Sequence, residues 1–354
     1  MHRFDIIQSD MENIYERNLS WELLRNKTIL ISGAYGMLAS YFVFFLIYLN
    51  ERDNMNIHII SLGRSREKYL ARFGEYCERE YMTFICDSLY EPIQIQDRID
   101  YIVHAASLAS PQYYRVSPVD VLMPNTIGTY YLLELAIQKK VNCFLLFSSG
   151  DIYGVVKNAD SIDESIQGTL DPLDIHNCYS ESKRMAETIC NAFYTQYNVP
   201  IKILRIWHTY SPTMDIEQDP RVFASFAGNI IRNENIVMKS NGLQKRSFCY
   251  IADAIAGYFY VLLNGRTGEA YNVCNSEQFI SIRELAEKLT SIFPEKKLIV
   301  IEKERDTNDS YVESTVSSNI MPSDKKLRSL GWSPQFSVED GFKKVIDFYT
   351  DNKL

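Results

Sequence analysis

A tyrosine and a lysine four residues apart form the first pair in the chain that could do chemistry. Tyr179 and Lys183 enclose the run Tyr-Ser-Glu-Ser-Lys, in a segment expected to be helical, and residues four apart share a helix face. A lysine ammonium beside a phenol favours the phenolate, so the tyrosine could act as base or acid near neutral pH. The pair alone is a common pattern, and its weight depends on the surrounding elements.

A serine and an aspartate stand upstream of this pair, where an apolar run ends. Ser149 and Asp151 follow the expected strand at 143–148. Ligands of open parallel sheets bind beyond the carboxyl ends of the strands, so both side chains are candidates for the catalytic centre. Asp151 could also be an ordinary turn residue.

A glycine-rich turn near the N-terminus has the spacing typical of dinucleotide-binding folds. It follows the apolar run at 28–32 and precedes a long apolar stretch. Gly33 would allow a tight turn, Gly36 would let the backbone approach a pyrophosphate, and Ala39 is small enough for a helix to pack on a strand. The amino end of that helix would attract phosphate. The candidate cofactor contacts of this turn are Gly33, Tyr35, Gly36, Met37 and Ala39.

The expected second strand, at 57–62, ends without the acidic residue that usually binds the ribose 2′-OH of NAD. Arg64 and Arg66 follow instead, and they could hold the 2′-phosphate of NADP or remain solvated loop charges. Asp87, after the next expected strand, is a candidate for binding the adenine amino group or for an ordinary turn. We expect NAD or NADP as cofactor, with NADP favoured.

Short apolar runs alternate with helical patterns up to residue 210, an order typical of right-handed βαβ units and a parallel sheet. The expected strands are 28–32, 57–62, 83–86, 100–105, 143–148 and 201–206, and the expected helices are 37–49, 65–80, 119–138 and 179–197. Beyond residue 211, helices mix with strands near 236–239, 269–273 and 298–301, which are not expected simply to extend the first sheet. The sequence therefore predicts an α/β fold: a Rossmann-type doubly wound parallel sheet with a smaller C-terminal α/β lobe. The expected parts are an N-terminal helical extension (1–26), a dinucleotide-binding domain (27–210) and a substrate-binding lobe (211–354).

The composition is that of an ordinary globular chain of 354 residues, with 46% hydrophobic and 23% charged residues. The net charge is −8 and Lys and Arg form no large cluster, so nucleic-acid binding is not expected. No apolar stretch is long enough to span a bilayer, and the acidic first 25 residues do not resemble a signal peptide. Seven cysteines without a Cys-x-x-Cys pair indicate free thiols rather than disulfides or a zinc site. We expect a cytoplasmic protein without a metal or membrane partner.

The order of these motifs resembles the extended short-chain dehydrogenases/reductases, and among them the NAD-dependent epimerase/dehydratase family of nucleotide-sugar enzymes. The resemblance runs from about residue 27 to 349. It is nearest to the UDP-glucuronate decarboxylase branch, with 4,6-dehydratases and 4-epimerases as relatives. Besides the motifs above, it rests on the segments His104-Ala105-Ala106-Ser107, Asn125–Thr129, Arg205–Pro212, Lys245–Asp253 and Leu330–Trp332.

The resemblance implies a role for each matching position. Tyr179 would take the proton of the sugar 4-OH, Lys183 would hold the nicotinamide ribose and lower the tyrosine pKa, and Ser149 would bind the 4-oxygen. The substrate would be a nucleotide-diphosphate sugar, with a UDP-sugar favoured, and the cofactor would stay tightly bound and be recycled. The remaining implied contacts are Ala105, Ala106, Ser107 and Asn125 for the cofactor, and Tyr114, His208, Arg221 and Arg246 for the substrate.

The chain departs from the family pattern at four places. His208 stands where many relatives have Asn, and Ser211 replaces a Gly. Gly150 and Asp151 stand where dehydratases usually carry Asp-Glu, so a paired acid–base elimination looks incomplete. Decarboxylases usually carry Glu at the position of Asp151 and an arginine in the stretch that here reads 318–323.

Oxidation at C4 enables decarboxylation, because a 4-keto group turns a C5 carboxylate into a β-keto acid. Among the reactions of the family, decarboxylation fits the loop after the expected strand at 143–148 best. A 4,6-dehydratase, a 4-epimerase or a nucleotide-sugar reductase stays open. A non-catalytic NAD(P)-binding regulator is least favoured, because the tyrosine, lysine and serine are all kept.

The resemblance also implies a homodimer formed through the helices at 119–138 and 179–197. Apolar residues support this interface but could instead face their own sheet. They are Leu132, Leu133, Leu135, Met185, Ile189 and Phe193.

Overall fold

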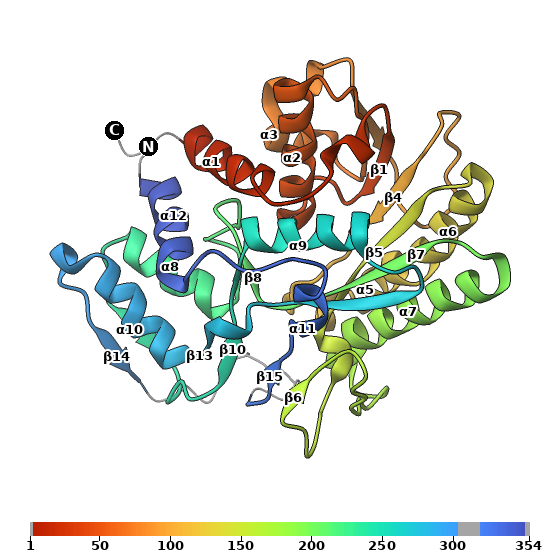
Figure 1. Cartoon of the computed structure of the whole chain (residues 1–354). Helices are drawn as coiled ribbons and strands as arrows, with labels where there is room; N and C mark the ends of the chain where they lie inside the picture. The colour runs from red at the N-terminus through yellow and green to blue at the C-terminus, as the bar shows by residue number, and fades with distance from the viewer. Residues whose placement is uncertain (1–2, 304–318, 351–354) are drawn as a thin grey trace.

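The computed structural model describes residues 3–303 and 319–350. Its centre is a seven-stranded parallel sheet in the order β12-β7-β5-β4-β1-β2-β3 (Figure 1). The strand order reverses between β1 and β4, and open α/β sheets bind their ligands at such a reversal. The predicted doubly wound fold is therefore confirmed. The strands are β1 (Thr28–Ser32), β2 (His58–Gly63), β3 (Met82–Cys86), β4 (Tyr101–His104), β5 (Cys143–Ser149), β7 (Ile201–Ile206) and β12 (Glu269–Val273).

Two hydrophobic cores lie on opposite faces of this sheet, because successive side chains of a strand point to opposite sides. In β1, Ile29 and Ile31 belong to one core and Leu30 belongs to the other. The helices over the first core are α2 (Met37–Asp53) and α9 (Ile251–Asn264), and those over the second are α6 (Ile127–Lys139) and α7 (Cys178–Tyr197) (Figure 1).

Three residues predicted for the dimer interface are buried in the second core. Leu132, Leu133 and Leu135 are at most 3% exposed and pack against their own sheet. Their assignment to an interface was wrong, because the apolar stripe of α6 that they form packs into the core on this face of the sheet, next to β4. Phe193 also belongs to this core, whereas Met185 is 49% exposed.

The helix expected at 119–138 is two helices, α5 (Pro118–Asn125) and α6. The chain leaves the helical pattern at Thr126, where φ is −104° and ψ is −75°. Pro124 contributes to the break because it has no N–H to donate within the helix. The last turn of α5 consequently presents Pro124 and Asn125 toward β4 and α7.

The C-terminal half of the chain contributes a strand to the main sheet. The expectation that its strands would not simply extend that sheet was wrong for β12, which pairs with β7 in parallel over five residues. The preceding helix α9 covers the sheet, so α9 and β12 complete a crossover of the usual βαβ kind. The division of the chain after residue 210 stays a prediction.

Three helices of this half pack on one another away from α6 and α7 (Figure 1). They are α8 (Val222–Ile231), α10 (Ile282–Ile292) and α12 (Val338–Thr350). Two small sheets lie beside them, β9 (Ile236–Met238) with β14 (Val300–Glu302), and β10 (Lys245–Ser247) with β13 (Phe279–Ser281).

The remaining elements are short. They are α3 (Arg66–Phe73), α4 (Gln112–Val116), α11 (Lys325–Arg328), β6 (Ser161–Ile162), β8 (Thr209–Tyr210), β11 (Cys249–Tyr250), β15 (Met321–Pro322) and the 3-10 helices η2 (Gly74–Glu78), η3 (Gly150–Tyr153), η4 (Ile175–Asn177), η5 (Ser276–Gln278) and η6 (Pro294–Lys296).

The N-terminal segment is helical and packs into the body of the protein. Its elements are α1 (Arg3–Tyr15) and the 3-10 helix η1 (Trp21–Leu24), and α1 contacts α2, α9 and α12. Asp10 is completely buried and accepts hydrogen bonds from Tyr41, Tyr250 and Lys344. Among the described helices, none is long and apolar enough to cross a membrane.

Candidate active site

The glycine turn lies at the point where the strand order reverses. The chain turns directly after β1 at Gly33, whose φ is +67°. A Cβ there would lie 2.7 Å from the Cα of Ala106, so only glycine lets the turn approach the loop after β4. Gly36 caps α2 and donates its N–H to the Gly33 oxygen at 2.9 Å, and Ala39, in the first turn of α2, is buried. The amino end of α2 therefore lies close to the loop after β4.

Tyr35 covers the end of β2, where the cofactor-selective residues were predicted. A Cβ on Gly63 would lie 2.3 Å from the Tyr35 ring, and the Tyr35 hydroxyl accepts the Arg64 N–H at 3.1 Å. Arg64 and Arg66 have exposed side chains. Asp87 is also exposed, and its N–H donates to the Gly63 oxygen at 3.1 Å. The structure thus brings Tyr35, Arg64 and Asp87 together at the carboxyl ends of β2 and β3.

Buried polar atoms without a hydrogen-bond partner among the described residues gather around the loop after β4. They include Ser107 Oγ, Ser110 Oγ and Asn125 Oδ1. Asn125 is completely buried, and its amide nitrogen donates to Val121 and Ser182 at 3.0 and 2.9 Å. A buried polar group without a partner costs about 1–3 kcal/mol, so several such groups around one loop fit a polar ligand. Together with the close approach of Gly33 and Ala106, they fit a dinucleotide.

Tyr179 stands in the first turn of α7 and is 7% exposed. Its ring stacks on Tyr114, with centroids 5.5 Å apart and planes 8° apart. Burial raises the pKa of Tyr179 above its ordinary value, and Asp151 raises it further, whereas a hydrogen bond with Ser149 and the charge of Arg221 act in the opposite direction. The structure therefore brings together five residues predicted separately.

Lys183 lies one turn further along α7 and is 2% exposed. Its ammonium donates to the Phe147 oxygen at 2.7 Å and lies 5.8 Å from the centre of the Tyr179 ring. Burial lowers the pKa of Lys183 to about 7, and Glu187 opposes this shift. The lysine therefore lies at the predicted place, and its effect on the tyrosine pKa stays a prediction.

The loop after β5 leaves room for one carboxyl group and not two. A Cβ on Gly150 would lie 2.7 Å from the ring of Trp207, so any side chain there would have to displace an indole. The Asp151 N–H donates to Ser149 Oγ at 3.1 Å. Burial raises the pKa of Asp151, and Arg246 opposes the rise. The loop thus supplies a single carboxyl group, and its burial favours the protonated form.

Arg221, one of the predicted substrate-binding residues, adjoins the glycine turn. Arg221 pairs with Asp219 through hydrogen bonds of 2.5–2.9 Å, and its guanidinium reaches the sulfur of Met37 at 4.0 Å. The Nδ1 atom of His208 is buried and has no hydrogen-bond partner within residues 3–303 and 319–350. Burial and the charges of Arg246 and Arg221 lower the pKa of His208 to about 3, so this imidazole is neutral beside two guanidinium groups.

Tyr114 lies beside Tyr179, and its contact with a sugar stays a prediction. Its side chain is 9% exposed, and its hydroxyl donates to the Ala109 oxygen at 3.0 Å. Because its ring stacks on Tyr179, Tyr114 can hold the tyrosine ring in place as well as border a substrate.

Two residues of the site were not predicted from the sequence. Asp219 pairs with Arg221, and Trp207 excludes a side chain at Gly150. Asp219 had a local signal, since it stands two residues before the arginine. Trp207 had none, because its contact joins β5 to the segment after β7.

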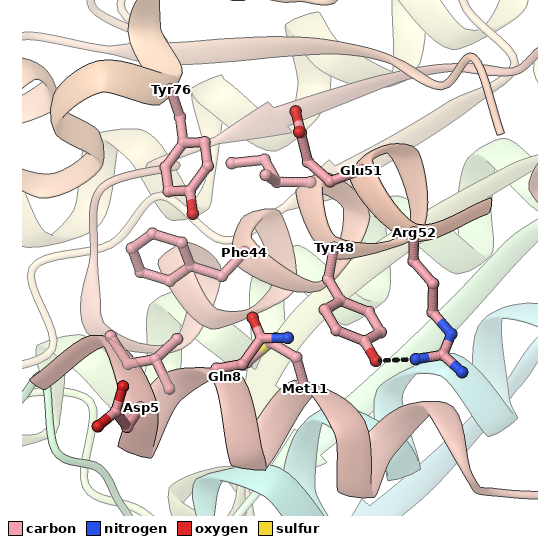
Figure 2. Close-up of a pocket in the computed structure, with 10 residues that line it drawn as sticks. Asp5, Gln8, Met11, Phe44, Tyr48, Glu51, Arg52 and Tyr76 are labelled. Carbon is pink, nitrogen blue, oxygen red and sulfur yellow. Dashed lines mark hydrogen bonds between the residues drawn. The ribbon is translucent and has the colours of Figure 1, made fainter. Parts of the chain in front are cut away.

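A cavity of about 400 Å³ lies elsewhere, between α1, α2 and η2 (Figure 2). Tyr76 and Phe44 border it from different elements, and Tyr48 hydrogen-bonds with Arg52 at its side (Figure 2). None of the predicted site residues lines it. In the part of the chain that the structure describes, no three His, Cys, Asp or Glu side chains gather as a metal site.

Comparisons with known proteins agree with this geometry. A family model, the NAD dependent epimerase/dehydratase family, matches residues 29–274. UDP-glucuronic acid decarboxylase 3 of Arabidopsis thaliana is 31% identical over 322 residues, which cover 89% of this chain and 87% of that protein.

Solved structures resemble the fold over most of its length. A UDP-glucose 4-epimerase from Thermotoga maritima, with UDP-glucose, has a TM-score of 0.76 and 21% identity and covers 92% of this chain and 99% of its own. A UDP-glucuronic acid 4-epimerase from Bacillus cereus, in complex with UDP-glucuronic acid and NAD, has a TM-score of 0.75, 20% identity and the same coverage. At these identities the likeness confirms the fold.

Proposed function

The chain belongs to the NAD dependent epimerase/dehydratase family, and we propose that it oxidises a UDP-sugar acid at C4, releases CO₂ from the keto acid and returns the hydride. Decarboxylase relatives at about 30% identity over most of the chain support the reaction. The gathered Tyr179, Ser149 and Asp151 support the placement of the chemistry beyond β5.

The residues of the chain divide the work as follows. Tyr179 takes the proton of the sugar 4-OH while Ser149 holds the oxygen. When bound, the nicotinamide dinucleotide accepts the C4 hydride and later returns it. Loss of CO₂ from the β-keto acid leaves an enolate, and Asp151, whose pKa burial raises, is the acid placed to protonate C5. Tyr179 then gives its proton back to the 4-oxygen.

The single carboxyl group after β5 favours decarboxylation over dehydration. Elimination of water needs an acid and a base, and the ring of Trp207 occupies the space where a side chain on Gly150 would lie. Decarboxylation needs only one proton donor. A 4-epimerase needs none beyond Tyr179 and stays the alternative, and a reductase would release its cofactor in each turnover.

A panel of nucleotide sugars tests this proposal. Purified protein is incubated with UDP-, dTDP-, GDP- and CDP-sugars, including UDP-glucuronic acid, and the products are weighed by mass spectrometry. Loss of CO₂ from a UDP-sugar acid is the expected result. Loss of water, or a change of retention without a change of mass, would replace the proposal with a dehydratase or an epimerase.

We further propose that NADP binds at least as well as NAD. The end of β2 carries no carboxylate, and the exposed side chains of Arg64 and Arg66, which follow it, are accessible to a 2′-phosphate. A hydrogen bond to a charged group contributes about 1.5–3 kcal/mol, or roughly ten- to a hundredfold in affinity. The NAD bound by the Bacillus cereus epimerase argues for the other dinucleotide.

Titration of the stripped protein with both dinucleotides decides between them. Arg64→Ala should weaken NADPH binding about tenfold and leave NADH nearly unchanged. Arg266→Ala is the matched control, because this 84% exposed arginine precedes β12 at the opposite end of the strands. A preference for NAD that Arg64→Ala does not alter would contradict the proposal.

We also propose a homodimer in the cytoplasm. Apolar side chains remain exposed on α5, α6 and α7, and the described cysteines are all free thiols. The exposed apolar residues of these helices are Val119, Ile127, Tyr130, Ile137, Met185, Tyr194 and Tyr197.

A further inference from the structure

A buried serine and a buried histidine join the ends of two central strands. Ser32 is the last residue of β1, and His104, the last residue of β4, is its partner across the parallel ladder. Ser32 Oγ lies 2.7 Å from His104 Nδ1, and the two residues are 0 and 1% exposed. The pair sits at the reversal of strand order, directly beneath the glycine turn.

The neighbours of the pair fix the direction of each hydrogen bond. His104 Nε2 lies 3.0 Å from the carbonyl oxygen of Pro124, which can only accept, so Nε2 carries the hydrogen and Nδ1 accepts from the Ser32 hydroxyl. The Ser32 oxygen in turn accepts the N–H groups of Ala105 and Ala106, both at 3.2 Å. Burial and the charge of Lys183 lower the pKa of His104 to about 3, so the imidazole stays neutral and keeps this arrangement.

We infer that Ser32 and His104 are a positioning pair that holds the loop after β4 against the glycine turn at the spacing a dinucleotide requires. The inference rests on the proposed function, because that loop is where the cofactor would lie. Ala106 Cα stands 2.7 Å from the position of a Cβ on Gly33. The loop and the turn therefore meet at a fixed distance. The Ser32 hydroxyl maintains this distance by accepting the N–H groups of Ala105 and Ala106.

The same pair connects the cofactor side of the site to the catalytic helix. His104 binds the carbonyl of Pro124, and the next residue, Asn125, donates to Ser182 Oγ at 2.9 Å. The Ser182 hydroxyl donates to the backbone oxygen of Tyr179 at 2.7 Å. A displaced loop would thus loosen the support of α5 against the first turn of α7.

Cofactor affinity, measured beside nucleotide affinity, tests the positioning role. Ser32→Ala should weaken binding of the reduced dinucleotide that the wild-type protein prefers by about 5- to 30-fold. Ser32→Thr, which keeps the hydroxyl, should restore it to within about threefold. UDP affinity, which reports on the Arg221 and Arg246 side, should change less than twofold. Ser61→Ala is the matched control, since Ser61 is equally buried in β2 and makes no hydrogen bond to the loop.

Unchanged dinucleotide affinity in Ser32→Ala would overturn the inference, and so would an equal loss of UDP and dinucleotide binding. If Ser32→Ala does not fold, hydrogen exchange on the wild-type protein replaces it: the amides of Ala105 and Ala106 should be protected, and exchange at the rate of an open loop would overturn the inference. Failure of the proposed reaction is seen separately, as an absence of CO₂ release from a wild-type protein that binds both ligands.

Discussion

The buried ammonium of Lys183 lowers the stability of the folded protein, although the proposed reaction needs it. The pKa of an unburied lysine is 10.5, and burial lowers that of Lys183 to about 7. The unfolded state therefore binds more protons between pH 7 and 10.5, and stability rises with pH across this window. The cost of burying the ammonium is fully present below pH 7, where both states are charged.

Lys183→Met should consequently stabilise the protein and abolish turnover. We expect a gain of roughly 1–3 kcal/mol at pH 6, because the buried charge is removed and one hydrogen bond to Phe147 is lost, and a smaller gain at pH 10. Thermal unfolding at both pH values measures it. Lys202→Met is the control, since Lys202 is also buried, donating to the Leu262 oxygen, but lies outside the site and should keep its activity. A methionine variant less stable than wild type at pH 6 would contradict the argument.

Tyr179→Phe should remove catalysis and spare cofactor binding. Phenylalanine keeps the stacking on Tyr114 and loses the hydroxyl that moves the proton, and such groups typically contribute 10²–10⁴-fold to the rate. Turnover and dinucleotide titration are measured on the same preparation. A variant that kept more than about a tenth of the wild-type rate would show that another group is the base.

Asp151→Asn should stop the reaction after oxidation. The amide cannot donate an acidic proton to C5, so a keto sugar and reduced cofactor should accumulate, visible as a stoichiometric absorbance of the reduced nicotinamide. Asp151→Glu, which keeps the carboxyl group, should retain turnover. A fully active asparagine variant would make Asp151 a structural residue.

Local spacing explains which site residues the sequence could predict. Tyr179 and Lys183 lie one helical turn apart, and the glycines of the turn lie within seven residues, so each pattern is contained in one element. Ser32 and His104 stand 72 residues apart, and their pairing depends on the strand order. The Trp207 contact likewise joins two strands and leaves no periodic signal.

At the level of elements, strands were predicted where an apolar run has polar residues on both sides. The bounds of β1 and β7 agree with the sequence prediction. The break between α5 and α6 was missed because Pro124 stands in a last turn, within a continuous apolar pattern. β12 was expected in the correct place but not in the main sheet, because a short run does not indicate which strand it pairs with.

Gly33→Ala tests whether the turn needs close approach or only a positive φ. Gly74 is the matched control, because its φ is +54° and a Cβ there would meet nothing within 4 Å. Gly74→Ala should cost about 1–3 kcal/mol of stability, because φ of +54° with ψ of −127° is a backbone conformation that favours glycine, and it should keep dinucleotide binding. Gly33→Ala adds a clash with the backbone of Ala106, so it should cost more and lose dinucleotide binding. Equal effects of the two variants would show that the approach is not needed.

At the scale of the whole molecule, the N-terminal segment ties the halves of the chain together. The Arg17 guanidinium pairs with Asp253 at the start of α9, at 2.7 Å, and donates to the Ser333 oxygen at 2.8 Å. Asp10 binds Tyr41 of α2 and Lys344 of α12. These buried contacts join the N-terminal segment to α2, which begins at the glycine turn, and to α9 and α12. They therefore help to hold Arg221 in position beside Met37.

The proposed dimer is the property of the whole molecule that one surface substitution can test. Met185 is 49% exposed on α7, and exposed tyrosines lie on α6 and α7. Met185→Glu should give a monomer in light scattering at micromolar concentration, because an unpaired carboxylate would be buried at the interface. Leu70→Glu is the control, since Leu70 is 45% exposed on α3, on another part of the surface, and this variant should remain a dimer. A wild-type protein that scatters as a monomer at the same micromolar concentration would contradict the proposal and leave these exposed residues as ordinary surface.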